Sequence, residues 1–317
     1  MEKKHIVCTI DDGYVKYCIV ALTSLLENNL TEEFDIHIVG SIHLEETRRL
    51  LKEVVENKYN QTLHIYPINE QELLKDFKHL DFRHFSITAC VRLFLTEILP
   101  QSISKILYLD SDLIVRKNIR SLWNTDITDY AIGCVEDMFS SKQSYYERLQ
   151  YDPKYSYFNS GVLLINLDYW RNNEVLQELM TYFHQQKDKL IFIDQDLLNG
   201  VFYSRKKNLS LMWNVQDGFL RVKRHVRSAT SRELDEIISD PAIIHYTGEK
   251  KPWHYKCENP YKVEYFYYLD KTQWKGERPA FQLGAWFERL FRPIAVALHL
   301  DKPRYRRIAK KSENVAN

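Results

Sequence analysis

Short apolar runs alternate with segments of helical periodicity along the first 115 residues. Strands are predicted at 5–10, 34–39, 62–68 and 105–109, and helices between them at 14–26, 44–55 and 86–99. Strands that alternate with helices of this length predict a parallel sheet with right-handed crossovers. The pattern therefore predicts an α/β fold with a Rossmann-like, mostly parallel central sheet and helices on both of its faces.

The same alternation continues less regularly in the rest of the chain. Strands are predicted at 131–135, 158–167 and 242–246, and helices at 168–184 and 193–202. Large apolar residues then recur every three or four positions from Leu283 to Leu298, with arginines between them. This amphipathic, basic C-terminal helical tail predicts attachment to an anionic membrane surface. The alternative is a helix packed on the core with its basic end in water.

Composition limits the class of protein. Lys and Arg number 44 against 43 Asp and Glu, so a surface built wholly for nucleic acid is excluded. An apolar fraction of 44% with 9 Gly and 9 Pro excludes a disordered or collagen-like chain. The five cysteines form no CxxC pair, and no apolar stretch approaches the roughly 20 residues of a membrane span. We expect free thiols and a cytoplasmic protein that its tail holds at the inner face of the cell membrane.

Carboxylates follow two of the predicted strands directly. Asp11 and Asp12 come after the first strand, and Asp110 and Asp112 come after the strand 105–109. Parallel sheets bind ligands at the carboxyl ends of their strands. Two carboxylates at positions i and i+2 can hold one Mg²⁺ or Mn²⁺ ion that keeps open positions for phosphate oxygens. The alternatives are a turn that these aspartates cap and a metal-dependent phosphatase with Asp110 as its nucleophile.

A second cluster of polar residues follows the last predicted strand. His245 can supply a nitrogen ligand to the cation. Gly248 lets the backbone approach a phosphate closely, and Lys250 and Lys251 could neutralise a diphosphate. A histidine alone is more often a satisfied polar residue, but this company of glycine, two lysines and Trp253 within nine residues favours a binding site.

Six short, different segments follow one another between residues 5 and 257 and carry a resemblance to a known family. They are TIDDGY from Thr9, SITACVRL from Ser86, LYLDSD from Leu107, FNSGVLLIN from Phe158, DQDLLN from Asp194 and HYTGEKKPW from His245. Together they resemble glycosyltransferase family 8, and within it the bacterial galactosyl- and glucosyltransferases of lipopolysaccharide and lipooligosaccharide synthesis. The resemblance implies a GT-A fold, a UDP-sugar donor, Mn²⁺ (or Mg²⁺) as cofactor, and retention of the anomeric configuration.

The resemblance also implies the residues that bind the donor and the metal. Asp110, Asp112 and His245 would hold the metal ion. Tyr14 would stack on uracil, and Asp11 would accept a hydrogen bond from the base. The residues expected to contact the nucleotide sugar are Thr9, Asp11, Asp12, Gly13, Tyr14, Arg92, Asp110, Ser111, Gly248, Lys250 and Lys251.

The transfer itself is implied to involve a third group of residues. Asp137, Asp194 and Gln195 would flank the sugar, with Gln195 beneath the anomeric carbon. Because an amide is a poor nucleophile, front-face attack is favoured, in which the departing phosphate oxygen takes the acceptor's proton. Double displacement through Asp194 is the other retaining route. The residues expected on the acceptor side are His84, Asn159 and Ser160.

The implied activity is metal-dependent transfer of galactose or glucose from a UDP-sugar to a cell-envelope glycan such as lipopolysaccharide. Gly13, Ser160 and Thr247 depart from the pattern of close relatives, which leaves the choice of hexose open. A catalytically idle nucleotide-sugar-binding protein is the alternative from another class. We expect a transferase domain at 1–257 and a helical, basic, membrane-attaching region at 258–317.

Overall fold

The structure, a computed structural model, describes residues 3–73, 75, 87–306 and 308. Its main sheet has the strand order β3-β2-β1-β4-β7-β6-β8. The strands β3, β2, β1 and β4 run parallel to one another, whereas β7 runs antiparallel to both β4 and β6. The mostly parallel sheet is therefore confirmed. Its strands are β1 (Lys4–Thr9), β2 (Phe34–Gly40), β3 (Thr62–Pro67), β4 (Lys105–Leu109), β6 (Ile132–Glu136), β7 (Phe158–Asn166) and β8 (Lys206–Asn208).

A small second sheet lies beside the carboxyl end of β4. It consists of β5 (Leu113–Val115), β10 (Ile243–His245) and β9 (Val215–Gln216), with β10 in the middle. Because β5 follows β4 after only three residues, the second sheet brings distant segments of the chain to the end of the first.

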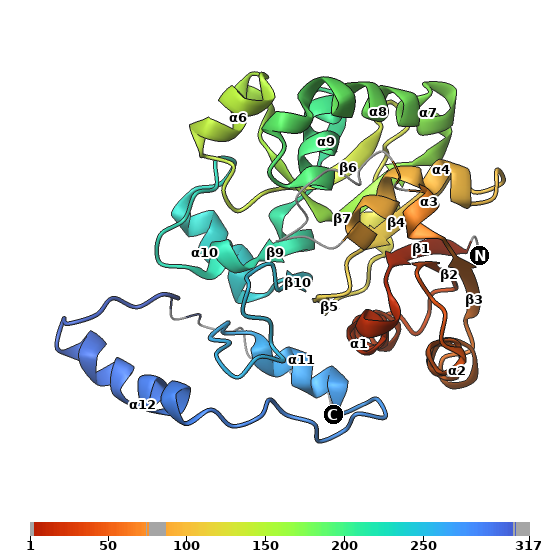
Figure 1. Ribbon diagram of the computed structural model, residues 1–317. Coiled ribbons are helices and arrows are strands. Elements are labelled where there is room, and N and C mark those ends of the chain that lie inside the picture. Colours follow the sequence, from red (N-terminus) through yellow and green to blue (C-terminus); the bar gives the residue numbers. More distant parts are fainter. Residues whose placement is uncertain (1–2, 74, 76–86, 307, 309–317) are drawn as a thin grey trace.

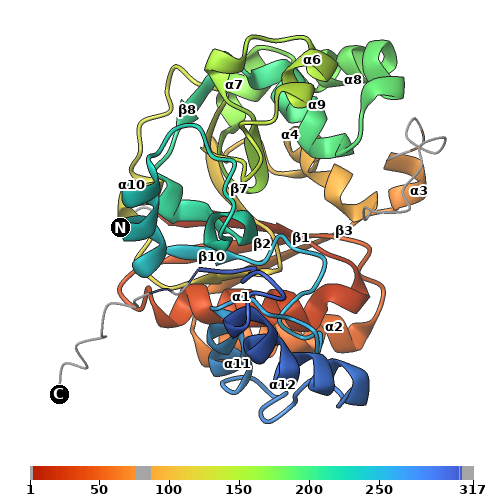
Figure 2. The same cartoon turned by 90° about the vertical axis from the view of Figure 1, so that its left-hand side faces the viewer.

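Helices cover both faces of the main sheet, as Figures 1 and 2 show. One face carries α1 (Val15–Glu27), α2 (Glu45–Lys52) and α11 (Lys262–Leu269), and the other carries α7 (Leu167–Asn172), α8 (Val175–Gln186) and α9 (Ile193–Phe202). The remaining α-helices are α3 (Glu70–Leu73), α4 (Leu95–Ile98), α5 (Arg120–Trp123), α6 (Gln143–Leu149), α10 (Ser231–Ser239) and α12 (Leu283–Ala297).

Each face of the sheet has its own apolar core because successive strand residues point to opposite sides. In β1, the side chains of Ile6 and Cys8 are buried with those of α1, whereas Val7 is buried in the core on the other face. All five cysteines are buried as free thiols, as predicted. Burial on both faces explains why this strand is a continuous apolar run rather than an alternating one.

Three predicted helices differ from the observed ones. The helix predicted at 44–55 is α-helical only as far as Lys52 and continues as a π-helix, η2 (Glu53–Lys58). The helix predicted at 168–184 is divided into α7 and α8, because Glu174 adopts a left-handed conformation with φ of 49°. The described part of the segment predicted at 86–99 begins as a 3₁₀ helix, η4 (Ile87–Phe94), and only its last turn is α4. Periodicity alone cannot separate these cases, since apolar residues three apart suit both helix types.

The chain after residue 257 makes two different kinds of contact. Tyr261, Tyr265, Tyr268 and Leu269 are buried in the same core as α1, whereas α12 stands away from the body (Figure 1). No helix among the described residues is long and apolar enough to cross a membrane. The division into domains at residue 257 stays a prediction.

The segment after α12 returns to the body of the molecule. The N–H of Val222 donates to the carbonyl of Arg304 (3.0 Å), and the N–H of Arg306 donates to that of Leu220 (3.0 Å). Between them, the Tyr305 hydroxyl donates to Oδ1 of the buried Asp217 (2.8 Å). Residues 304–306, called here the closing segment, are thus held by main-chain and side-chain hydrogen bonds.

Candidate active site

Asp110, Asp112 and His245 meet where the two sheets join. Asp110 follows β4, Asp112 precedes β5, and His245 ends β10, whose antiparallel pairing sets it opposite Leu113. The His245 Nε2 atom lies 3.1 Å from Asp112 Oδ1 and 3.6 Å from Asp110 Oδ2. One ligand atom from each residue lies within 4.8 Å of the others. Two carboxylates and one imidazole suit Mn²⁺ or Mg²⁺, so the residues fit the predicted ion.

Lys251 lies directly beside this metal-ligand group. Its ammonium lies 2.5 Å from Asp112 Oδ2 and donates to the carbonyl of Tyr246 (2.6 Å). Burial opposes ionisation of Asp112, but the charge of Lys251, followed by the proximity of His245, outweighs it and holds the pKa of that carboxyl well below its usual range. The carboxylate is therefore available as a ligand at neutral pH.

Arg92 ties the metal-ligand group to the neighbouring carboxylate of Asp194. Its guanidinium is buried and donates to Asp110 Oδ1 (2.8 Å) and to the carbonyl of Ser160 (2.7 Å). Its Nε lies 3.3 Å from Asp194 Oδ2, and the group stacks 4.4 Å above the Tyr108 ring. The first role of this arginine is thus to orient two carboxylates. Its predicted contact with the donor stays a prediction.

The end of β1 forms an open edge next to the metal-ligand group. The carboxylate of Asp11 accepts from the N–H of Tyr14 (3.0 Å), and that of Asp12 accepts from the N–H of His43 (3.0 Å). Tyr14 is 42% exposed, and burial together with the charge of Asp112 raises the pKa of its hydroxyl. The Thr9 hydroxyl lies 2.7 Å from that of Tyr108. An exposed aromatic ring near two carboxylates can accept a stacked base.

Buried polar side chains continue the site toward α9. The oxygen of Gln195 accepts from the N–H of Ser160 and from the amide nitrogen of Asn159, both at 3.1 Å. Its own nitrogen donates to Asp137 (3.3 Å). Burial raises the pKa of Asp137 to about 6, and burial also raises that of Asp194. Two buried carboxyls with raised pKa values are typical of catalytic sites.

Sequence comparison matches the profile described as Glycosyl transferase family 8 to residues 5–257. This chain is a family 8 glycosyltransferase. It is 28% identical over 280 residues to general stress protein A of Bacillus subtilis, across 86% of this chain and 95% of that protein. It is also 28% identical over 249 residues to an Escherichia coli lipopolysaccharide 1,2-glucosyltransferase, across 77% of this chain and 71% of that protein.

The fold comparison agrees with the family. The crystal structure of the galactosyltransferase LgtC, with donor and acceptor sugar analogues, superposes with a TM-score of 0.75 at 28% identity. The match covers 85% of this chain and 96% of that one. The family 8 transferase thus has the GT-A fold, and its three convergent side chains form a group that can hold a metal ion, consistent with the DxD motif in the sequence.

The remaining predicted residues of this transferase differ in their burial and contacts. Gly248 lies against the carboxylate of Asp217, since an added Cβ would come within 3.3 Å of it. Lys250 and Gly13 are exposed, and Ser111 is buried, with no hydrogen-bond partner for its hydroxyl among the described residues. His84 lies outside the described residues.

Two residues near the transferase's metal-ligand group were not predicted. A Cβ on Gly161 would lie 2.2 Å from His245 Cε1 and 2.6 Å from Asp110 Oδ2, so only glycine fits beneath the ligands. Its position in the segment FNSGVLLIN was the available signal. The buried Asn214 faces His245 Nδ1 at 3.0 Å, and no sequence motif marked it.

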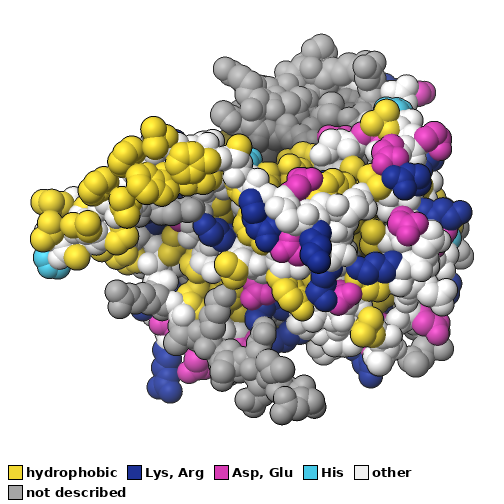
Figure 3. Space-filling view, turned by 90° about the horizontal axis from the view of Figure 1, so that it is seen from below, with side chains coloured by type: hydrophobic (Ala, Val, Ile, Leu, Met, Phe, Trp, Pro, Cys, Tyr) yellow, Lys and Arg dark blue, Asp and Glu magenta, His cyan; other side chains and the backbone are white. Residues whose placement is uncertain are grey.

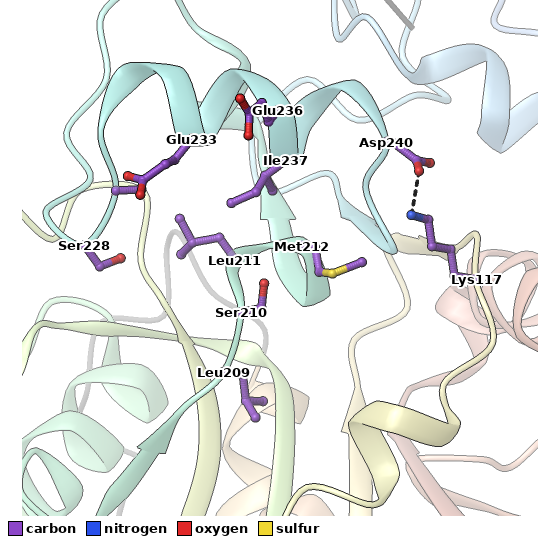
Figure 4. A pocket seen from close by; sticks show the side chains of 11 residues that line it. Lys117, Leu209, Ser210, Leu211, Met212, Ser228, Glu233, Glu236, Ile237 and Asp240 are labelled. Atoms are coloured by element: carbon purple, nitrogen blue, oxygen red, sulfur yellow. Dashed lines mark hydrogen bonds and ion pairs between the residues drawn. The ribbon is translucent and has the colours of Figure 1, made fainter. Parts of the chain in front are cut away.

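A separate pocket of about 530 Å³ lies beneath α10 (Figure 4). Leu211, Met212 and Ile237 line it, and Lys117 pairs with Asp240 at its edge. None of the predicted donor, metal or transfer residues lines this pocket.

Proposed function

We propose that this family 8 enzyme transfers galactose or glucose from a UDP-sugar to a cell-envelope glycan, with retention and with Mn²⁺ or Mg²⁺. The observation that carries the proposal is the convergence of Asp110, Asp112 and His245 beside Lys251. A divalent cation at these ligands supplies charge neutralisation for the diphosphate of departing UDP. The glycan class follows the named relatives, one a lipopolysaccharide glucosyltransferase and one a galactosyltransferase.

In this proposal, one group of side chains binds the uracil base of the donor and a second group binds its diphosphate. Tyr14 stacks on uracil, and Asp11 accepts from the base at the open end of β1. Thr9, Asp12 and Gly13 shape the same edge. Around the diphosphate, Lys251 supplies positive charge, and Arg92, Ser111, Gly248 and Lys250 complete the proposed contacts. These contacts hold the scissile bond against the transfer residues.

Transfer proceeds by front-face attack in this proposal. The bond from the anomeric carbon to the phosphate oxygen breaks, the acceptor oxygen bonds to the same face, and its proton passes to the departing oxygen. Two donors occupy the Gln195 oxygen, which makes this amide an even poorer nucleophile. Asp194, fixed by Arg92, and Asp137 stabilise the cationic sugar. Asn159, Ser160 and His84 are the proposed acceptor side.

The first test is UDP release from a panel of UDP-sugars, with Mn²⁺ and with chelator. We expect release from UDP-galactose or UDP-glucose only with metal, and its loss in Asp112→Ala. The matched control is Glu46→Gln, an exposed carboxylate on α2 whose partner is Arg49. Release that chelator and Asp112→Ala leave unchanged would contradict the metal role. UDP binding without release would favour an idle binding protein, and phosphate release through Asp110 would favour a phosphatase.

A second part of the proposal is that α12 lies on a membrane surface. Six large apolar side chains along it are between 39% and 59% exposed, and Figure 3 shows hydrophobic side chains gathered on this protruding part. Arg292 pairs with Glu258 (2.5 Å) and Asp301 (3.0 Å), and Arg306 lies 3.2 Å from Asp235. These arginines fasten the tail to the body, so apolar area rather than charge drives the proposed attachment.

Vesicle flotation tests the attachment of α12. We expect Trp286→Ser with Phe287→Ser to reduce binding to phosphatidylglycerol vesicles, because two aromatic anchors are lost. The control is Ile191→Ser, an exposed apolar residue just before α9 and outside the tail. Equal flotation of the double variant would contradict the proposal. Self-association without lipid that the double variant abolishes would assign α12 to a contact between two copies of the chain.

A further inference from the structure

The buried amides between the metal-ligand group and Gln195 have only one possible orientation. Oxygen and nitrogen of an asparagine side chain look alike, so hydrogen-bond logic must assign them. The backbone N–H of Gly161 can only donate, and it points at the Asn159 side chain (3.0 Å). The atom that receives it must therefore be the amide oxygen of Asn159.

The same logic places a proton on Nδ1 of His245. The oxygen of Asn159 also receives a bond from Asn214 (2.9 Å), so the nearer atom of Asn214 is its nitrogen. The oxygen of Asn214 then faces His245 Nδ1 at 3.0 Å, and an oxygen there requires a proton on Nδ1. In the neutral imidazole this leaves the lone pair on Nε2, the atom that faces Asp110 and Asp112.

A second backbone donor fixes the other end of the chain of amides. The N–H of Ser160 points at Gln195 (3.1 Å), so the atom of Gln195 that receives it is the oxygen. The nitrogen of Asn159 donates to that oxygen (3.1 Å), as its own assignment requires. The nitrogen of Gln195 is left for Asp137. Two independent backbone donors thus agree on every orientation.

We propose that Asn214 and Asn159 are positioning residues that set the metal-binding tautomer of His245 and tie it to Gln195. The inference rests on the metal role in the proposed function. Asn214 acts through its oxygen on His245 and through its nitrogen on Asn159. Both asparagines are buried, and Asn214 has no solvent-exposed surface. Partners that orient a metal-ligating histidine typically change metal affinity about 10–100-fold when they are removed.

Two substitutions at Asn214 separate its two contacts. Asn214→Leu removes both, so Mn²⁺ affinity measured by calorimetry with UDP should fall about 10–100-fold. Asn214→Asp keeps an oxygen for His245 Nδ1 but cannot donate to Asn159. Its Mn²⁺ affinity should stay close to that of the parent, while kcat falls and KM for the donor changes little, because Asn159 no longer holds Gln195.

Asn29→Leu is the matched control for the loss of a buried amide. Asn29 is 2% exposed, and its side chain binds the Leu25 and Lys117 carbonyls and the Ile119 N–H, none of which belongs to the proposed metal or transfer residues. It should lower the unfolding midpoint as Asn214→Leu does, with unchanged Mn²⁺ affinity.

Three results would overturn the inference. Parent-like Mn²⁺ affinity in folded Asn214→Leu would remove the role toward His245. An equal loss of affinity in Asn214→Asp would show that the acceptor oxygen is not what matters. Parent-like kcat in Asn214→Asp would break the proposed link to Gln195. Since the parent's own Mn²⁺ affinity is measured first, absence of metal binding there would instead refute the proposed metal function.

Discussion

At the residue scale, His37 makes the stability of the fold depend on pH, because its imidazole is buried among other titratable groups. Its imidazole lies 3.0 Å from His5 Nδ1 and 3.2 Å from the Tyr66 hydroxyl, and it stacks on His64. Asp35 lies within 4 Å of both His5 and His64, and Lys3 pairs with Asp35. Burial, followed by the charges of His64 and His5, lowers the pKa of His37 to about 3. The folded protein therefore holds this side chain neutral.

The pH dependence of stability should show this burial. The unfolded chain binds a proton at His37 below about pH 6.5, whereas the folded chain resists it, so the free energy of unfolding falls as pH drops. The expected slope from this residue is about 1.4 kcal/mol per pH unit between 6.5 and 3. Urea midpoints of His37→Gln should fall less steeply from pH 7 to 5. The exposed His184→Gln should keep the parent slope, and a parent slope in His37→Gln would contradict the assignment.

Single residues also show how far the sequence alone could lead. Asp110, Asp112 and His245 were predictable because their motifs end strands, and strand ends meet at one edge of a sheet. Asn214 was not, since it faces His245 only through the pairing of β9 with β10, which no local pattern marks. Arg92 was predicted as a donor contact, but only the fold reveals that it bridges Asp110 and Asp194.

At the scale of elements, β7 decides the shape of the metal-ligand group. The N–H of Asp110 donates to the carbonyl of Gly161 (2.9 Å), so this strand lies against the end of β4. Periodicity predicted a buried strand here, yet its antiparallel direction depends on the long connection through β6 and could not be deduced locally. The break between α7 and α8 could not be predicted either, because no sequence signal marks the left-handed conformation of Glu174.

Gly161→Ala tests the fit between β7 and the ligands. The added Cβ would lie 2.2 Å from His245 Cε1, and overpacking of this kind typically costs about 1–3 kcal/mol. We expect weaker Mn²⁺ binding in calorimetry with UDP, because His245 must move. In Gly284→Ala on α12 the new methyl group meets nothing within 4 Å, so this variant serves as control. Unchanged affinity in Gly161→Ala would show that the ligands tolerate a shift.

At the scale of the whole molecule, the tail and the active site share one buried carboxylate. Asp217 receives the Tyr305 hydroxyl of the closing segment, Asn259 Nδ2 (3.1 Å) and the guanidinium of Arg221 (2.9 Å). Gly248, a proposed donor contact, lies against the same carboxylate. Deletion of the whole tail would therefore disturb the active site as well as α12, which is why point substitutions are needed to test attachment.

Tyr305→Phe should reveal this shared carboxylate. Loss of a hydrogen bond to a charged group costs about 1.5–3 kcal/mol, so the urea midpoint should fall. Because Asp217 packs against Gly248, KM for the UDP-sugar should rise more than kcat falls. The exposed Tyr267→Phe on α11 provides the comparison and should change neither quantity. A lower midpoint with unchanged KM would separate the closing segment from donor binding.

The closing segment also imposes an order on biosynthesis. Tyr305 is translated 88 residues after Asp217, the carboxylate that it covers. Domains begin to fold from the N-terminus during synthesis, so the nascent chain contains Asp110, Asp112, His245 and Gly248 before it contains Tyr305. Until then Asp217 must rely on Arg221 and Asn259. Tyr305, the last of these partners to be synthesised, can therefore bind Asp217 only after the tail has been translated.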